Sequence, residues 1–222
     1  MLSLNNIKTR SKLLLSFSII IIFTIIVGVN GQLTTNKLQE NFKDFYTDSF
    51  VSNILLGKIQ VNQEKASTEI QRILYKTETI QDQSVMMASI ENLNKLIEEN
   101  NRLIQEYEAL NLLPEEIDLL DRLKTANINY RFARETVIET MQNGNFSYAV
   151  EINDQKARVL RENVSEILSQ MKEVNNEIAI AMMDANQVEF DKSRNRAIIL
   201  SGIALLVCIG FTLFLSNSIA NP

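Results

Sequence analysis

The sequence predicts an all-α protein: an antiparallel four-helix bundle of up-down-up-down topology, anchored in a membrane by two transmembrane helices that continue into its first and last helices. Three observations support this fold. Only six Gly and two Pro occur among 222 residues, too few turn residues for a many-stranded sheet. Long uncharged apolar segments lie near both ends of the chain. The polar segment between them repeats its apolar residues at helical spacing.

The composition also excludes several classes of function. The chain has no His, and its one Cys is Cys208, which excludes Ser-His and Cys-His nucleophile pairs, Cys/His zinc sites and an intrachain disulfide. All 27 Asp and Glu residues lie between Glu40 and Asp191. Because this acidic segment has no basic stripe, we expect no nucleic-acid partner. We therefore predict a protein that is not an enzyme and has no cofactor and no metal site.

The first apolar segment begins at Leu13, and we expect residues 13–31 to form a transmembrane helix, since about 20 helical residues cross a bilayer. A cleavable signal peptide is the alternative. However, the segment is longer than the apolar core of a signal peptide and lacks a small-x-small cleavage site. Residues 1–12 are basic, and positive charges beside a span favour a cytoplasmic N-terminus.

The second apolar segment contains no charged residue from Ala197 onward, and we expect residues 197–216 to form the second transmembrane helix. Two spans return the chain to its starting side, so residues 32–196 are predicted to be extracytoplasmic, on a cell (inner or plasma) membrane. Arg194 and Arg196 then lie outside, against the positive-inside rule, but that rule weakens for segments of this length.

The last bundle helix, expected at 146–196, has the clearest pattern between the spans. Its apolar residues recur every three or four positions without a break, which is typical of a coiled-coil seam. These residues are Leu160, Val164, Ile167, Met171, Val174, Ile178, Ala181, Ala185 and Val188. No Gly or Pro separates this seam from the second span, so we expect one continuous helix.

The other three helices are expected at 32–79, 82–111 and 115–142. The first of them follows the first span without an intervening Pro. Pro114 and the two acids after it predict a helix start, because Pro suits the first turn and acids oppose the helix dipole there. The stretch Asn143–Asn145 contains a Gly and predicts the end of the third helix.

Apolar residues near the membrane lack partners within one chain. The two middle helices are shorter than the outer two, so they do not reach the membrane-proximal part of the outer helices. Phe42 on the first helix and Val188 on the last still need burial. A second copy of the chain is the simplest cover, and we predict a symmetric homodimer.

Three amides interrupt the apolar seams of their helices at nearly the same level of the bundle, namely Gln63, Asn100 and Asn127. One polar layer in a bundle core can fix the register of the helices, which is the role we expect. Alternatively, the layer lines a small-molecule pocket between helices. Arg131 and Arg134, on the third helix, are expected to be surface charges.

Three short motifs follow one another along the chain: Ile7–Phe17 before the first span, Gly144–Ala149 before the last long helix, and Asn217–Pro222 after the second span. Together they resemble the four-helix-bundle sensor domain of methyl-accepting chemotaxis proteins, and the resemblance covers essentially the whole chain. Residues 217–222 look like the start of a HAMP linker. We therefore expect either a fragment of a longer receptor, truncated at the start of HAMP, or a sensor that has lost its output domain.

The resemblance implies a transmembrane sensory receptor module for signal transduction. It would sense an extracytoplasmic small molecule or periplasmic protein and transmit a helix shift across the membrane. Cytoplasmic signalling partners are implied only if a downstream domain exists. Two alternatives remain open: the sensor module of a histidine kinase, and a membrane-tethered helical scaffold that senses nothing.

The resemblance also suggests ligand-binding residues. The family's amino-acid receptors use arginines in the region of Arg72 and Lys76 to hold a ligand carboxylate. The alternative is that both residues belong to a solvated basic face that pairs with Glu69 and nearby acids.

Overall fold

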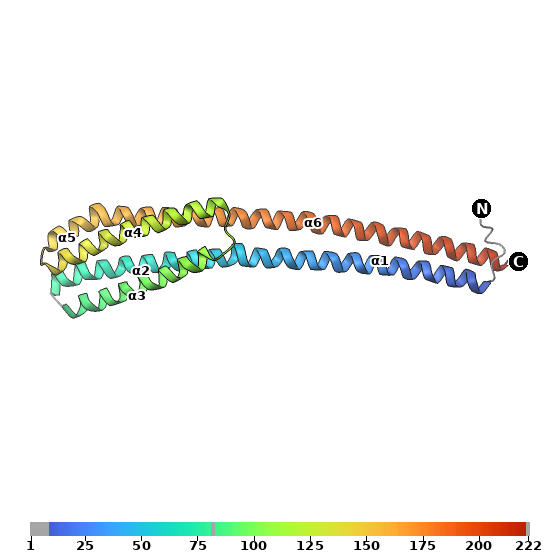
Figure 1. The fold of residues 1–222 in the computed structure, drawn as a ribbon, viewed down its shortest axis with the longest axis horizontal. Helices are drawn as coiled ribbons and strands as arrows, with labels where there is room; N and C mark the ends of the chain where they lie inside the picture. Colours follow the sequence, from blue (N-terminus) through green and yellow to red (C-terminus); the bar gives the residue numbers. More distant parts are fainter. Residues whose placement is uncertain (1–8, 81–82, 221–222) are drawn as a thin grey trace. The chain divides into compact units, whose positions relative to one another are not determined.

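The fold is all-helical, as predicted. The computed structural model describes residues 9–80 and 83–220, except for a few side chains near the ends of these ranges, and it contains no strand among them. Figure 1 shows the order of the elements. They are α1 (Thr9–Asp44), the π-helical turn η2 (Phe45–Phe50), α2 (Val51–Ile80), α3 (Gln83–Glu108), α4 (Pro114–Gln142), α5 (Phe146–Ile152), the π-helical turn η3 (Asn153–Ala157) and α6 (Arg158–Ala220).

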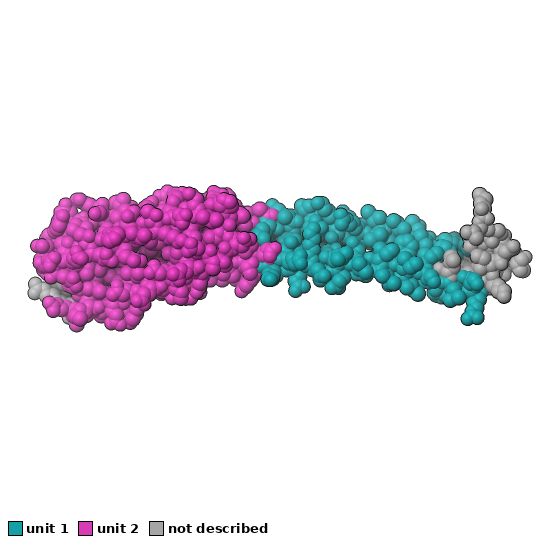
Figure 2. Space-filling view, viewed as in Figure 1, with its two compact units in different colours: residues 1–43, 182–222 teal, residues 44–181 magenta. Residues whose placement is uncertain are grey.

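The chain divides into two compact units, coloured separately in Figure 2. One unit, which we call the bundle unit, comprises Asp44–Ala181. The other, which we call the paired-helix unit, comprises Met1–Lys43 together with Met182–Pro222.

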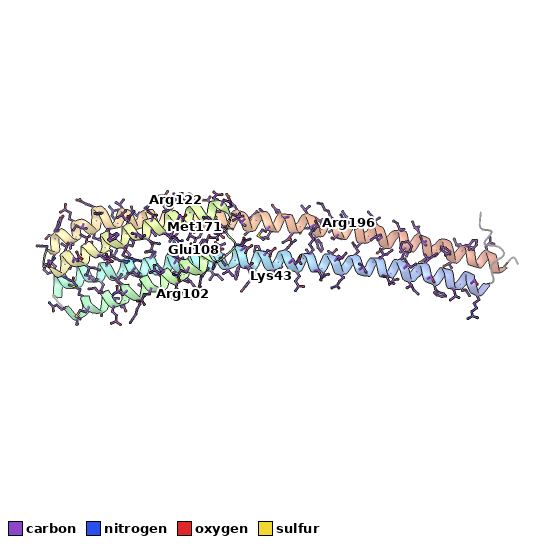
Figure 3. All side chains as sticks on the ribbon, in the orientation of Figure 1. Lys43, Arg102, Glu108, Arg122, Met171 and Arg196 are labelled. Atoms are coloured by element: carbon purple, nitrogen blue, oxygen red, sulfur yellow. The ribbon has the colours of Figure 1, made fainter. Side chains whose placement is uncertain are left out.

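The bundle unit packs α2, α3, α4 and the first part of α6 around one apolar core, which confirms the predicted four-helix bundle. Each helix contributes side chains from its inner face, and Met171 of α6 is fully buried whereas Arg102 and Arg122 lie outside (Figure 3). The largest fully buried side chains are Leu56, Ile59, Ile73, Leu93, Leu103, Tyr107, Leu123, Val137, Met141, Val164, Leu168 and Met171.

Polar contacts on the outside of the bundle unit fix the register of neighbouring helices. Lys124 of α4 forms an ion pair of 2.6 Å with Glu108 of α3. α6 is joined to α2 by hydrogen bonds from Arg161 to Ser67 and from Lys172 to Gln60. These exposed or half-exposed contacts each add little stability, so the core carries most of it.

The predicted boundaries of α4 are confirmed. Pro114 occupies the first turn, and Glu116 Oε2 accepts a hydrogen bond of 2.8 Å from the backbone N–H of Leu113, which caps the helix. At the other end Gly144 has φ of 75°, a left-handed conformation that favours Gly.

In the paired-helix unit, α1 and the second part of α6 run antiparallel and are joined by polar side chains. Lys37 Nζ lies 3.0 Å from Glu189 Oε1, and this hydrogen-bonded pair lowers the pKa of Glu189. Asn41 donates a hydrogen bond of 2.5 Å to Asn186. The side of each helix that faces its neighbour within the chain is therefore polar at these levels.

The two longest helical stretches each contain a segment apolar enough to cross a membrane. The helices Phe17–Tyr75 and Phe146–Phe214 include windows of 18 residues with mean hydropathy of 1.9 and 2.6, and no residue of these windows is buried. The limits 13–31 and 197–216 for the spans themselves remain predictions.

Candidate functional site

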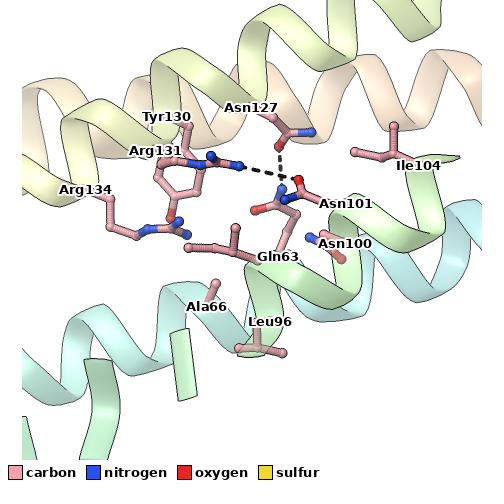
Figure 4. A pocket seen from close by; sticks show the side chains of 11 residues that line it. Gln63, Ala66, Leu96, Asn100, Asn101, Ile104, Asn127, Tyr130, Arg131 and Arg134 are labelled. Carbon is pink, nitrogen blue, oxygen red and sulfur yellow. Dashed lines mark hydrogen bonds between the residues drawn. The ribbon is translucent and has the colours of Figure 1, made fainter. Parts of the chain in front are cut away.

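The bundle unit contains a small polar cavity between α2, α3 and α4 (Figure 4). Its volume of about 30 Å³ is enough for one or two water molecules. It is lined by Gln63, Ala66, Leu96, Ile97, Asn100, Asn101, Ile104, Asn127, Tyr130, Arg131 and Arg134.

All three amides of the predicted polar layer line this cavity. Gln63 Nε2 donates a hydrogen bond of 2.6 Å to Asn127 Oδ1. Two further amide atoms, Asn100 Oδ1 and Asn127 Nδ2, are buried and have no hydrogen-bond partner among the described residues. Buried polar atoms are normally paired. The cavity therefore has both the space and the unused hydrogen-bonding atoms to hold a small polar group such as water.

Arg134 also lines the cavity, and the expectation that it is a surface charge is wrong, because its exposure is only 5%. Its guanidinium carbon lies 5.3 Å from the centre of the Tyr130 ring, one helical turn earlier. Burial lowers the pKa of Arg134 and raises the pKa of Tyr130. Arg134 falls on the inner face of α4 because it lies four positions after the buried Tyr130 and three before the buried Val137.

Arg131 and Arg134 differ in their surroundings. Arg131 is half-buried at the edge of the cavity and donates a hydrogen bond of 3.4 Å to Asn101 Oδ1 (Figure 4). Arg134 has no carboxylate within ion-pair distance among the described residues. The nearly fully buried guanidinium of Arg134 is therefore not part of a close ion pair, but it interacts with the Tyr130 side chain and, electrostatically, with Glu135.

The residues suggested by the family resemblance lie elsewhere. Arg72 is on the exposed side of α2, where its Nη1 forms an ion pair of 3.2 Å with Glu69. The side chain of Lys76 lies outside the described part of the chain. Arg72 does not line the cavity, and a ligand-binding role for Arg72 and Lys76 remains a prediction.

A second buried polar network, which the sequence pattern does not predict, joins α3, α4 and α6. The Tyr107 hydroxyl donates a hydrogen bond of 3.0 Å to Glu116 Oε1 and accepts one of 3.0 Å from Asn175 Nδ2. Burial raises the pKa of Tyr107 well above its usual range. Glu116 was recognisable in sequence as an acid in a first helical turn, but no pattern indicated that Asn175 would lie beside Tyr107 in space.

The amino-acid sequence was compared with the models of known protein families, and one family matches most of the chain. Residues 6–190 match the family described as a four helix bundle sensory module for signal transduction. The chain belongs to this family. A search of curated proteins found no match. This sensory module, with its two apolar helices, is a signal-transduction module of a membrane protein, and such modules are typically not enzymes.

The polar cavity brings together groups of the kind that contact small molecules in proteins. It combines two guanidinium groups, several amides and an apolar wall, all held by three packed helices. These groups can donate and accept hydrogen bonds to a small molecule. Because they come from different helices, an occupant would contact α2, α3 and α4 at once.

Proposed function

We propose that this sensory module is the receptor part of a chemotaxis-type transmembrane signalling protein. Residues 1–12 lie in the cytoplasm, residues 13–31 and 197–216 cross the inner or plasma membrane, and residues 32–196 lie outside. The module senses an extracytoplasmic ligand or partner protein and transmits a helix shift inward. The match of residues 6–190 to a sensory family is the observation that carries this proposal.

The continuity of α6 supports the mechanism. The helix runs from Arg158 to Ala220, so it contains both core residues of the bundle unit and the apolar stretch expected to span the membrane. Packed helices slide by roughly 1–2 Å in switching proteins. A change in packing around Met171 would therefore be passed along a single element rather than through a loop.

A chimera tests this function. Residues 1–216 would be joined to the cytoplasmic part of a chemotaxis receptor whose kinase output is measurable. We expect a metabolite or periplasmic extract to change the output about 5- to 150-fold, the usual range of allosteric coupling. A chimera lacking residues 44–181 serves as the control and should not respond. Equal responses from both chimeras would show that the bundle unit senses nothing, and would favour the scaffold alternative.

The apolar surface of the paired-helix unit supports a homodimer. Phe42 is 66% exposed, and Val188 is 52% exposed in the single chain. The residues of α6 that face α1 are instead polar, such as Asn186 and Glu189. The seam that includes Ala185 and Val188 therefore points away from the chain's own α1, and a second copy would bury it.

Disulfide cross-linking in membranes tests the dimer. In a Cys208→Ser background, we expect Val188→Cys to convert most of the chain to a covalent dimer on mild oxidation, because the dimer would bring two copies of the exposed seam together. Asn186→Cys is the matched control, since Asn186 faces Asn41 of its own chain. Cross-linking of Asn186→Cys as fast as, or faster than, Val188→Cys would contradict the proposed interface.

A further inference from the structure

We propose that Tyr107, Glu116 and Asn175 form a releasable latch that holds α6 in its resting position beside the α3–α4 turn. The latch deepens the proposed function, on which its signalling role rests. A stimulus that breaks the latch would free the part of α6 that leads to the predicted second span. Tyr107 and Asn175 are therefore positioning residues, since neither has to touch a ligand.

The place of Asn175 in α6 is the first argument. Its side chain is 0% exposed, whereas every later residue of α6 whose side chain the structure describes is half-buried or exposed. The bundle unit itself ends soon afterwards, at Ala181. The last fully buried side chain of α6 before the predicted second span is therefore polar.

The direction of the Asn175 contacts is the second argument. Asn175 Nδ2 donates a hydrogen bond of 3.0 Å to the Tyr107 hydroxyl and one of 2.9 Å to the backbone oxygen of Met171. Only the first bond joins α6 to another helix. A hydrogen bond is lost beyond about 3.5 Å, so a helix shift of roughly 1–2 Å is enough to break it. Apolar contacts have no preferred direction and tolerate such a shift better.

The rigid mounting of Tyr107 is the third argument. Its hydroxyl donates a hydrogen bond of 3.0 Å to Glu116 Oε1, while Glu116 Oε2 accepts one of 2.8 Å from the backbone of Leu113. Burial raises the pKa of Tyr107, so the hydroxyl keeps the proton that it donates. Both ends of the α3–α4 turn are thereby tied together, and α6 is the part that can move away.

The unpaired oxygen of Asn175 explains why the latch is releasable. Asn175 Oδ1 is buried and has no hydrogen-bond partner among the described residues. Buried polar atoms are normally paired, so the resting position leaves one atom of this amide unsatisfied. A single neutral hydrogen bond also contributes only modestly to stability. The contact therefore defines one position of α6 without holding it there irreversibly.

Protection of buried thiols tests the latch in the full chain in a mild detergent. In a Cys208→Ser background, Met171→Cys places a thiol one turn from Asn175, and Val164→Cys places one about 10 Å farther along α6. Both replaced side chains are 0% exposed. We expect Tyr107→Phe to raise the rate at which a water-soluble maleimide modifies Met171→Cys about fivefold, the population change expected for one neutral hydrogen bond. Modification of Val164→Cys should change less than about twofold.

Tyr130→Phe is the matched control. Tyr130 is also buried, but its hydroxyl interacts with Arg134 of its own helix, so this change should leave the rate at Met171→Cys unaltered. Asn175→Ala is a second variant in case Tyr107→Phe fails to fold, and it should also raise that rate. Adding Tyr107→Phe to Asn175→Ala should have little further effect, because the hydroxyl has then lost its partner on α6.

Two results would overturn the latch. An unchanged rate at Met171→Cys would show that the hydrogen bond does not hold α6. Equal acceleration at Met171→Cys and Val164→Cys would show a general loss of stability rather than local release.

The thiol assay separates this inference from the proposed function because it involves no signalling. In the receptor chimera, Tyr107→Phe should shift the unstimulated kinase output and Tyr130→Phe should not. Local release in a chain whose chimera never responds upholds the latch and refutes the proposed function. A responsive chimera whose unstimulated output is unaffected by Tyr107→Phe leaves the proposed function intact and overturns the latch.

Discussion

Glu116→Ala will lower the free energy of unfolding of the chain by about 3 kcal/mol. The carboxylate caps α4 by accepting the Leu113 N–H, and the loss of such a cap costs about 1 kcal/mol. The carboxylate also accepts a hydrogen bond from the buried Tyr107 hydroxyl. Without Glu116 this hydroxyl would lose its acceptor, at a cost of about 1–3 kcal/mol.

The matched control is Glu115→Ala, which removes an exposed acid from the same first turn. We expect a change within about 0.5 kcal/mol for the control, as for most exposed substitutions. Urea titrations of the full chain in a mild detergent, followed by circular dichroism, measure both values. Equal destabilisation by the two variants would show that the network of Tyr107, Glu116 and Asn175 contributes nothing specific.

Gln187→Pro will abolish the stimulus-dependent output of the receptor chimera. Gln187 is exposed in α6, between the bundle unit and the predicted second span. Proline inside a helix removes a backbone hydrogen bond and clashes with the preceding turn, at a cost of about 3 kcal/mol. A helix broken at this position would no longer carry a shift of its first part to the membrane.

Gln187→Ala is the control, because it removes the same side chain and its hydrogen bond to Asp191 but keeps the helix. The kinase output of both chimeras would be measured with the stimulus that activates the parent. We expect the alanine variant to respond like the parent and the proline variant to give a constant output. A normal response from the proline variant would rule out transmission through a continuous α6.

The helices were predictable because their signals are local. Pro114 and Gly144 act within a few residues of themselves, and they mark the two ends of α4 in the structure as they do in the sequence. The seam of α6 is buried in the bundle unit at Val164, Ile167 and Met171, where periodicity predicted it. The periodicity of apolar residues shows which face of each helix is buried. In a four-helix bundle, these buried faces largely determine how the helices pack.

The candidate site was less predictable because it depends on which residues meet in space. The antiparallel pairing expected of the helices brought Gln63, Asn100 and Asn127 to one level, and the structure places all three around the same cavity. Arg134 was misjudged because a charged residue is rarely buried without a partner, and nothing local marks the exception. Asn175 was missed because its partner Tyr107 is on another helix.

Labelling of introduced cysteines in intact cells tests the central claim, a sensory bundle held outside the membrane, most directly. In a Cys208→Ser background, Asp118→Cys places a thiol on the exposed face of α4, and Asn217→Cys places one just beyond the predicted second span. With a membrane-impermeant maleimide, we expect Asp118→Cys to be labelled in intact cells and Asn217→Cys only after lysis. Labelling of Asn217→Cys but not Asp118→Cys in intact cells would place the bundle in the cytoplasm and contradict this account.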